Sequence, residues 1–172
     1  MADPEVVILI GSANDWKHLQ GAVDVLRKLG ITFEVHVSSA HRTPVRTAEL
    51  VQSAEAAGCR AFICAAGMAA HLAGVVASLT IRPVLGVPLP GGVLDGVDAL
   101  LSTVQMPAGI PVATFAVGSA GARNAAIFAA QIVADNRPEI RASLKALRTE
   151  GEAKVLAGDR QVAAAVSEED AQ

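Results

Sequence analysis

The sequence predicts an α/β fold: a doubly wound, three-layer α/β/α sandwich around a central parallel sheet. Three observations lead to this prediction. Short apolar runs alternate with segments of helical periodicity along the whole chain. These runs are apolar throughout rather than at every second residue, which is typical of parallel strands covered on both faces. The chain has 172 residues, of which 52% are hydrophobic, and this suits one domain with a sizeable core.

The first half of the chain contains three successive strand–helix units. A strand is expected over Val6–Ile10, and a helix follows from about Asp15 to Leu29, where apolar residues recur at helical spacing. Gly30 comes just after the last turn, as a glycine commonly does at a helix end. The same pattern then predicts two more units: strands over Ile31–Val37 and Arg60–Ala65, with helices over Thr43–Ala57 and about Ala69–Leu79.

The second half predicts two further strands, Pro83–Val87 and Val112–Val117, and a long Gly- and Pro-rich loop over Pro88–Gly96. Such a loop is suited to a lid or an irregular wall of a site. The helix expected over Ala122–Ala134 is apolar on nearly every side, so it must be covered on all sides. We expect a second subunit to supply part of that cover, which makes the protein a homo-oligomer.

A more charged helix is expected from Pro138 to about Leu156. We place the domain at residues 1–160 and expect residues 161–172, which end in an acidic run, to form a disordered tail.

Composition narrows the range of partners and compartments. The formal net charge is −3 with Arg and Lys scattered, so no nucleic-acid partner is expected. Gly and Pro break every apolar stretch before the ~20 residues that a bilayer needs, so no membrane partner is expected. No signal peptide is visible. The two cysteines, Cys59 and Cys64, lack metal-ligand spacing and suit reduced thiols of a cytoplasmic protein. No His, Cys or carboxylate pair has the spacing of a metal site.

The loop from Ser38 to Pro44 is the most informative stretch, because it follows a predicted strand directly. Arg42 offers a fork of donors for a phosphate or carboxylate, and His41 can exchange a proton near neutral pH. The alternative is a helix-capping loop with two solvated side chains. In doubly wound sheets ligands bind at the carboxyl ends of the strands, and this favours the functional interpretation.

The first loop enters a helix through Gly11 and Ser12, and the free N–H groups of a helix N-terminus attract anions. Asp15 would repel phosphate, so a functional Asp15 should bind sugar hydroxyls; the alternative is that Asn14 or Asp15 is only the N-cap. The loop is not a dinucleotide-binding G-x-G-x-x-G motif, and the second strand does not end in an acidic residue.

The third loop, Ala66–Gly74, is built from small residues that let a ligand approach the backbone. His71 follows in the first turn of the next helix; it either borders the site or is a polar residue satisfied near a helix N-terminus. The fifth loop, Gly118–Gly121, is a weaker candidate for an anion site.

Taken together, the loop motifs resemble one family, the bacterial-type 5-(carboxyamino)imidazole ribonucleotide mutases of purine biosynthesis. The resemblance extends from about Val6 to Ala134. The motifs occur in the same order as in that family: G-S-x-N-D-W, S-A-H-R-T-P, A-A-H-L, G-V-P and Q-M-P-x-G-I-P-V.

The resemblance implies a flavodoxin-like sandwich that assembles as an octamer, needs no metal or cofactor, and acts on a small-molecule ribonucleotide. The enzyme would move a carboxylate from the exocyclic nitrogen of an aminoimidazole ribonucleotide to carbon four of its ring. His41 matches the catalytic histidine of the family. The positions that match or line its substrate pocket are Ser12, Asp15, Ser39, Arg42, Gly67 and His71.

The chemistry of these residues agrees with the implied reaction. Arg42 with Ser12 and Ser39 can hold a phosphate, and Asp15 can accept hydrogen bonds from ribose hydroxyls. Carboxyl migration through release and recapture of CO₂ needs a proton delivered and later removed, which one imidazole in a water-poor pocket can do. We therefore expect His41 to be the general acid and base.

The sequence also departs from the family pattern. Met68 stands where a glycine is expected, Ala73 replaces a proline, and the run Leu89–Val93 differs from the usual small polar residues. Two other functions compete with the mutase. A related branch carboxylates aminoimidazole ribonucleotide directly with CO₂, but it generally lacks A-A-H-L and has lysine in place of Arg42. The other is a nucleotide-binding module without turnover.

Overall fold

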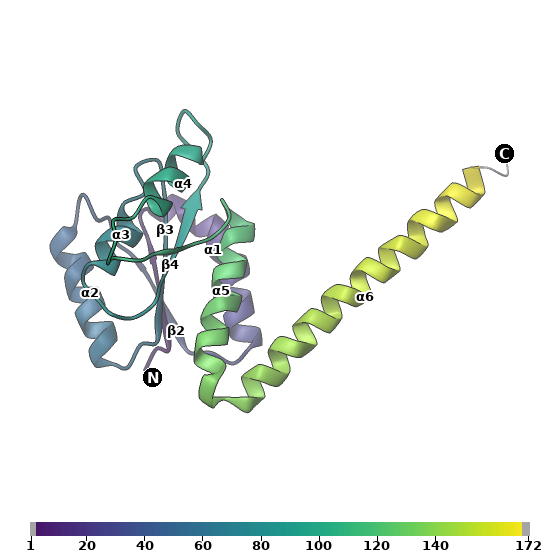
Figure 1. Cartoon of the computed structure of the whole chain (residues 1–172), viewed down its shortest axis with the longest axis horizontal. Helices are drawn as coiled ribbons and strands as arrows, with labels where there is room; N and C mark the ends of the chain where they lie inside the picture. The colour runs from purple at the N-terminus through teal and green to yellow at the C-terminus, as the bar shows by residue number, and fades with distance from the viewer. Residues whose placement is uncertain (1–2, 170–172) are drawn as a thin grey trace.

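The computed structural model describes residues 3–169 and shows a parallel sheet between two layers of helices (Figure 1). The strands are β1 (Val6–Ile10), β2 (Phe33–Val37), β3 (Ala61–Gly67), β4 (Val84–Leu89) and β5 (Ala113–Thr114). The α-helices are α1 (Trp16–Lys28), α2 (Pro44–Ala56), α3 (Leu72–Ala77), α4 (Val97–Val104), α5 (Ser119–Val133) and α6 (Pro138–Glu169). Short 3₁₀ turns, η1 (Ala13–Asp15) and η2 (Ala134–Asn136), precede α1 and α6.

The sheet has the order β2-β1-β3-β4-β5, and every pair is parallel. This is the flavodoxin-like order, so the predicted fold class is confirmed. In the register, Ile10 at the end of β1 lies opposite Val37 of β2 and Ala65 of β3. The loops that follow these three strands therefore emerge side by side at one edge of the sheet.

Successive residues of β1 supply two separate cores, which explains why the strand is apolar throughout. Val6, Ile8 and Ile10 pack with α1, α5 and the start of α6. Val7 and Leu9 point to the opposite face and pack with α2 and α3. All five side chains are buried, as expected of a strand covered on both faces.

Most element boundaries shift by one to three residues from the sequence prediction, and three differences are larger or have a clear physical reason. The third helix begins at Leu72 rather than near Ala69, because Met68 has a left-handed backbone (φ +55°) that interrupts any helix before it. Helix α4 was not expected, although Val97, Leu100, Leu101 and Val104 recur at helical spacing; the segment is only eight residues long and directly follows a Gly- and Pro-rich loop. The last strand is two residues long, because Pro88 of β4 has no N–H with which to extend the ladder.

Helix α5 is covered within its own chain. Its buried face packs on α1, β3 and β4, and the start of α6 covers another side, with Ile140 fully buried. Arg123 and Gln131 on the outer side are exposed. The chain itself covers most of this helix, but Phe128 on its outer side stays 42% exposed, and the homo-oligomer stays a prediction.

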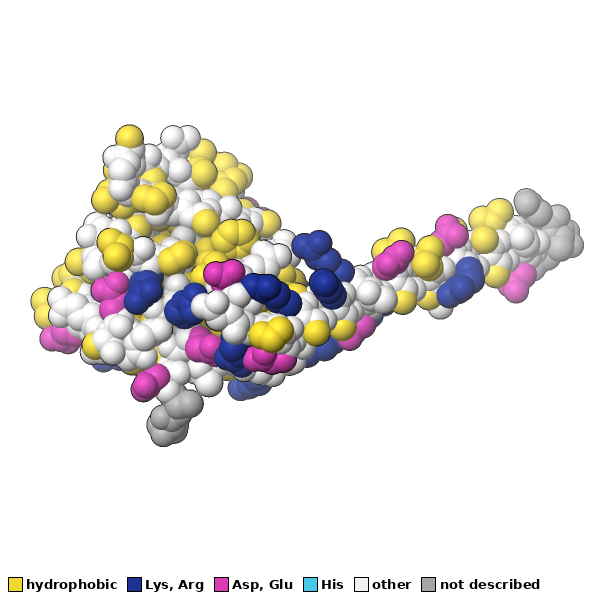
Figure 2. Space-filling view, turned by 60° about the horizontal axis from the view of Figure 1, so that its bottom comes forward, with side chains coloured by type: hydrophobic (Ala, Val, Ile, Leu, Met, Phe, Trp, Pro, Cys, Tyr) yellow, Lys and Arg dark blue, Asp and Glu magenta, His cyan; other side chains and the backbone are white. Residues whose placement is uncertain are grey.

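Helix α6 continues to Glu169, so its expected end near Leu156 is wrong. An ion pair between Lys28 Nζ and Glu150 (2.6 Å) ties its first half to α1. Beyond that pair the helix leaves the sandwich (Figure 1), and apolar side chains such as Val155 and Val162 lie exposed among charged ones (Figure 2). Residues 161–169, which the sequence predicts to lie in a disordered tail, form the end of α6, and residues 170–172 lie outside the described part.

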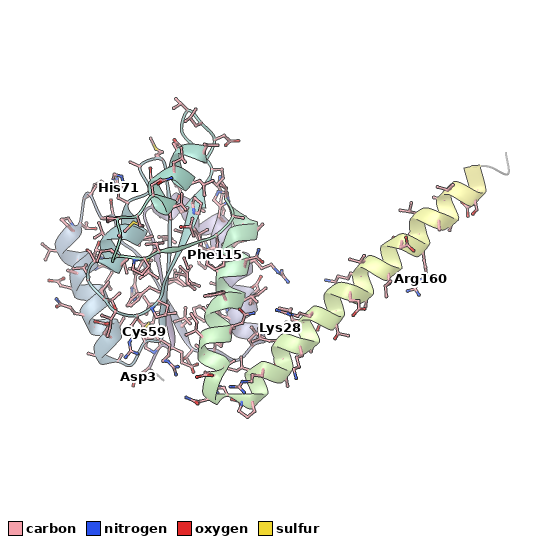
Figure 3. All side chains as sticks on the ribbon, in the orientation of Figure 1. Asp3, Lys28, Cys59, His71, Phe115 and Arg160 are labelled. Carbon is pink, nitrogen blue, oxygen red and sulfur yellow. The ribbon has the colours of Figure 1, made fainter. Side chains whose placement is uncertain are left out.

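Both cysteines are unpaired and buried. Burial raises the pKa of the Cys59 and Cys64 thiols above their ordinary values. Figure 3 labels Cys59 at the end of the sheet opposite His71. Among residues 3–169, no helix combines the length and the apolar content needed to cross a bilayer.

Candidate active site

Four loops, those after β1, β2, β3 and β4, enclose a cleft of about 520 Å³ at the carboxyl edge of the sheet. The cleft lies where the strand order reverses, between β1 and β3, which is the position at which doubly wound folds bind ligands. The loop after β1 contributes Gly11, Ser12, Asn14 and Asp15, and the loop after β2 contributes the run from Ser39 to Arg42. The loops after β3 and β4 contribute mainly small or apolar residues.

A hydrogen bond to α2 and a tight turn hold the loop after β2 in shape. Ser38 is buried, and its hydroxyl is 2.8 Å from that of Thr47 in α2. The Thr43 N–H donates to the Ser39 carbonyl (2.8 Å), which closes a turn around the three residues between them. This turn projects His41 and Arg42 from the protein surface, and both are exposed at the cleft. Pro44 occupies the first turn of α2, as predicted.

Two histidines from different loops meet at this cleft. The Nε2 atom of His41 lies 3.0 Å from the Nδ1 atom of His71, and the two rings meet edge to face. One of these nitrogens must carry the hydrogen and the other must accept it. The ring of His41 is therefore oriented by a partner that can also donate or accept a proton. His71 is labelled at the start of α3 in Figure 3.

In the loop after β1 the carboxylate of Asp15 does not cap the helix that follows. Ser12 caps the turn η1 by accepting a hydrogen bond from the Asn14 N–H (3.3 Å), whereas the Asp15 side chain makes no capping bond to α1. Burial raises the pKa of Asp15, against the lowering effects of the hydrogen bond to the Ser12 backbone and of positive charge on Lys17. Asp15 thus stands at the N-cap position of α1, but its side chain lines the cleft instead of capping the helix.

The loop after β3 brings the chain close to β4. Gly67 is the last residue of β3 and is paired with Leu89; an added Cβ there would stand 3.4 Å from the Leu89 carbonyl oxygen. Met68 then adopts its left-handed conformation, and two tight bonds follow, from Ala70 N–H to Met68 O and from His71 N–H to Ala69 O. This turn places the His71 ring against His41.

All seven residues selected from the sequence lie at this edge of the sheet. Six of them line the cleft: Ser12, Asp15, Ser39, His41, Arg42 and Gly67. His71 joins it through His41 and also lines an adjoining hollow with Leu101 and Met106 of the α4 region. Their chemical roles stay predictions.

Three contributions to the cleft were not selected from the sequence. Asn14 was considered only as an N-cap, Met68 only as a departure from a family pattern, and the run Pro90–Gly92 only as a lid or wall. The composition of the last run was the available signal, because Gly- and Pro-rich loops often border sites. Among residues 3–169, no three His, Cys, Asp or Glu side chains gather as a metal ion would require.

The sheet order and the polar cleft at its switch point define the class of the protein: a doubly wound α/β protein with a small-molecule site. The chain belongs to the AIR carboxylase family, whose model matches residues 5–154. The family resemblance drawn from the loop motifs is thereby confirmed.

Relatives of known name agree with this membership. The N5-carboxyaminoimidazole ribonucleotide mutase of Pseudomonas aeruginosa is 48% identical over 151 residues, which span 88% of this chain and 93% of the relative. The mutase of the same name from Saccharolobus solfataricus is 48% identical over 142 residues, 83% of this chain and 89% of the relative. The crystal structure of Treponema denticola PurE superposes with a TM-score of 0.82 at 28% identity and covers 92% of this chain and 98% of that one.

Proposed function

We propose that this protein is an isomerase of purine biosynthesis that converts 5-carboxyamino-1-(5-phosphoribosyl)imidazole into 5-amino-1-(5-phosphoribosyl)imidazole-4-carboxylate. The observation that carries the proposal is the contact of His41 Nε2 with His71 Nδ1 at 3.0 Å, in a cleft that also holds Arg42 and Asp15. The names of relatives that are 48% identical over most of the chain support it.

The polar side of the cleft suits the phosphoribosyl group. Arg42 can donate two parallel hydrogen bonds to a phosphate, and the Ser12 and Ser39 hydroxyls can donate further ones. The Ser39 hydroxyl already accepts from the Arg42 N–H (3.3 Å), which leaves its own hydrogen for a ligand. Asp15 can accept hydrogen bonds from the ribose hydroxyls, and its half-buried position disfavours a second anion such as phosphate next to it.

His41 serves as both acid and base in this proposal. The bond between the exocyclic nitrogen and the carboxylate breaks, CO₂ leaves, and the nitrogen keeps the electron pair and takes a proton from the imidazolium of His41. Carbon four of the ring then attacks CO₂, and the neutral imidazole removes the proton from that carbon. The imidazolium is restored, so one proton moves from carbon to nitrogen and no external acid, base or cofactor is consumed.

The position of His71 fits this cycle. The Nε2–H of His41 can donate to the His71 nitrogen 3.0 Å away in both the imidazolium and the neutral ring, because the proton exchanged with the substrate is then the one on Nδ1 of His41. His71 thus keeps the His41 ring in one orientation through both proton transfers.

Assembly into a homo-oligomer, an octamer by resemblance, is part of the proposal. Large apolar side chains lie exposed on the loop before α4 and along that helix: Val93, Leu94, Val97 and Leu101. Exposed apolar groups gathered in one region are typical of a protein–protein interface. Light scattering at micromolar concentration tests the assembly, and a monomer would contradict it. The two unpaired, buried cysteines support action in the reducing cytoplasm.

A second candidate is a carboxylase that adds CO₂ directly to aminoimidazole ribonucleotide. The description of the matched family, AIR carboxylase, favours it. The two activities share the step in which carbon four attacks CO₂, and they differ in whether the CO₂ comes from the substrate or from solution.

An ultraviolet assay of the interconversion, without added bicarbonate or metal, tests the proposal. Turnover under these conditions is the expected result. Turnover only with aminoimidazole ribonucleotide and concentrated bicarbonate would favour the carboxylase instead. Binding of the ribonucleotide without turnover in either assay would indicate the non-catalytic module.

A further inference from the structure

Two buried hydroxyls lie at the base of the loop that carries His41. Among residues 3–169, the polar or charged residues that are buried are Ser38, Thr47 and Thr103. The Oγ atom of Ser38 lies 2.8 Å from the Oγ1 atom of Thr47, and the two residues are only 1% and 0% exposed. Two buried polar residues in the described part of the chain thus bond to each other where this loop begins.

Thr47 occupies a position where an amphipathic helix normally has an apolar residue. The buried residues of α2 are Thr47, Val51 and Ala54, which follow one another at helical spacing. Val51 and Ala54 belong to the core on this face of the sheet. A hydroxyl in such a place costs free energy unless it is hydrogen-bonded, and a valine of the same branched shape would avoid that cost. The hydroxyl of Thr47 therefore needs a reason other than filling the core.

The hydrogen bonds of this pair run in one direction. The Thr47 hydroxyl has a single hydrogen, and it donates to the Thr43 carbonyl one turn earlier in the chain (3.1 Å). The Ser38 hydroxyl is then the donor in its bond with Thr47. This bond joins the residue that follows β2 to the start of α2, and both hydroxyl hydrogens have an acceptor.

The loop between these elements, the β2–α2 loop (residues 39–43), is fastened at both ends. On the strand side, the Ser38 N–H donates to the Ile10 carbonyl of β1 (2.9 Å). On the helix side, the Thr43 hydroxyl accepts from the Ser39 N–H and donates to the Ser39 carbonyl, each at 3.0 Å. The buried hydroxyl bond sets how the end of the strand and the start of the helix sit relative to each other, so it sets the base of the loop.

The position of the His41 ring depends on the shape of this loop. His41 is exposed, and the polar contact of its side chain among residues 3–169 is the one with His71 at 3.0 Å. Apart from that contact, the backbone of the β2–α2 loop decides where the ring lies. Proton transfer needs heavy atoms about 2.6–3.2 Å apart, and a misplacement of about 1 Å can cost about a hundredfold in rate. A small shift of the loop therefore slows proton transfer strongly.

We propose that Ser38 and Thr47 are positioning residues for His41. Their bond holds the base of the β2–α2 loop in one place, and the loop holds the ring where it can exchange a proton with the substrate. A hydrogen bond is directional, whereas apolar side chains packed in the same place tolerate a range of positions. Both hydroxyls are buried and act only through His41. The inference rests on the proposed isomerase function.

Two variants separate positioning from stability. Thr47→Val leaves the Ser38 hydroxyl buried without its acceptor, so it should lower the free energy of unfolding. Ser38→Ala combined with Thr47→Val removes both hydroxyls, and such a paired replacement should be nearly neutral for stability. Both variants should nevertheless lose roughly tenfold in kcat, because the base of the loop is no longer fixed. The KM should change less than about twofold, since the long side chain of Arg42 can follow a small shift.

Thr47→Ser is the matched variant that keeps the hydroxyl. Its kcat should stay close to that of the wild type, although the lost methyl group should destabilise the protein slightly. Thr149→Val is the control outside the site. The Thr149 hydroxyl also donates to a carbonyl one turn earlier in its helix (Lys145, 3.4 Å), but it is exposed on α6. This control should leave both kcat and KM unchanged.

Nuclear magnetic resonance measures the ring of His41 without turnover. The ¹⁵N chemical shifts of its two ring nitrogens, assigned by their loss in His41→Asn, report which nitrogen carries the hydrogen. In the wild type and in Thr47→Ser they should show one tautomer, with the hydrogen on Nε2 facing His71. In the double variant the shifts should average between the two tautomers, because the ring loses its fixed partner.

Three results would overturn the inference. They are an unchanged kcat in the double variant, a loss of kcat in Thr47→Ser as large as in Thr47→Val, and a single tautomer of His41 that persists in the double variant. Failure of the proposed function gives a different result, since the wild type would then produce no product from the carboxyamino substrate, whatever the ring spectra show.

Discussion

The two halves of the cleft differ in chemistry although both sit on strands of one sheet. The loops after β1 and β2 carry Asp15, Arg42 and several hydroxyls, whereas the loops after β3 and β4 present small and apolar surfaces. The two halves meet where His41 of the first half touches His71 of the second. The difference teaches that one edge of a sheet can present a charged half and an apolar half to the same cleft, with a pair of histidines between them.

The largest effect is expected where the two halves meet. His41→Asn should lower turnover by roughly a thousandfold, because it removes the group that delivers and accepts the proton. Binding of the ribonucleotide, measured by calorimetry, should remain close to that of the wild type. His36→Asn is the control, since His36 lies on β2 paired with Glu34 and does not line the cleft. Near-normal turnover in His41→Asn would refute its role.

The next effect should fall on the polar half alone. Arg42→Gln removes a charge-assisted pair of hydrogen bonds to phosphate, which corresponds to about 1.5–3 kcal/mol of binding free energy. The KM should rise at least roughly tenfold with a smaller change in kcat. Arg46→Gln, one turn further along α2 and outside the cleft lining, should leave the KM unchanged. A loss confined to kcat would contradict the assignment of Arg42 to phosphate.

Asp15 should make the KM for the ribonucleotide depend on pH. Burial raises its pKa above the ordinary 3.8, so protonation begins at a higher pH than for an exposed aspartate. Only the carboxylate accepts from two ribose hydroxyls, so the KM should rise as the pH falls through this raised pKa. Asp15→Asn should have a severalfold higher KM near neutral pH, and its KM should not rise further as the pH falls. Asp24→Asn, on the exposed side of α1, should keep the rise of the KM at low pH. If that rise also survives in Asp15→Asn, a group other than Asp15 causes it.

The smallest effect should be a change in the shape of the apolar half. Gly67→Ala places a Cβ 3.4 Å from the Leu89 carbonyl oxygen, so the ends of β3 and β4 must separate slightly. The free energy of unfolding should fall by about 1 kcal/mol, as measured by urea denaturation, and ribonucleotide binding should weaken slightly because Gly67 lines the cleft. Gly21→Ala in α1 meets no atom within 4 Å and should be neutral or stabilising. A higher free energy of unfolding in Gly67→Ala would show that the ends of β3 and β4 can separate without cost.

Local sequence patterns predicted those parts of the fold that depend on burial. The apolar run Val6–Ile10 matches β1 because each of its side chains enters one of two cores. Patterns failed where a distant residue decides the outcome, as Pro88 does for the length of β5. The candidate site followed from loop motifs, yet the contact of His41 with His71, thirty residues apart in sequence, arises from the left-handed turn at Met68. Such a contact leaves no periodic pattern in the sequence from which it could be predicted.

Because two cysteines are buried in the core, opening of the core can be measured in the unmodified protein. A thiol that is buried and held in its protonated form does not react with a disulfide reagent until the surrounding layers separate. Cys64 sits on β3 in the core between the sheet and helices α2 and α3, so its labelling requires that core to be breached. The rate at which a disulfide reagent labels Cys64 therefore measures how often this core opens, without an added dye or an engineered residue.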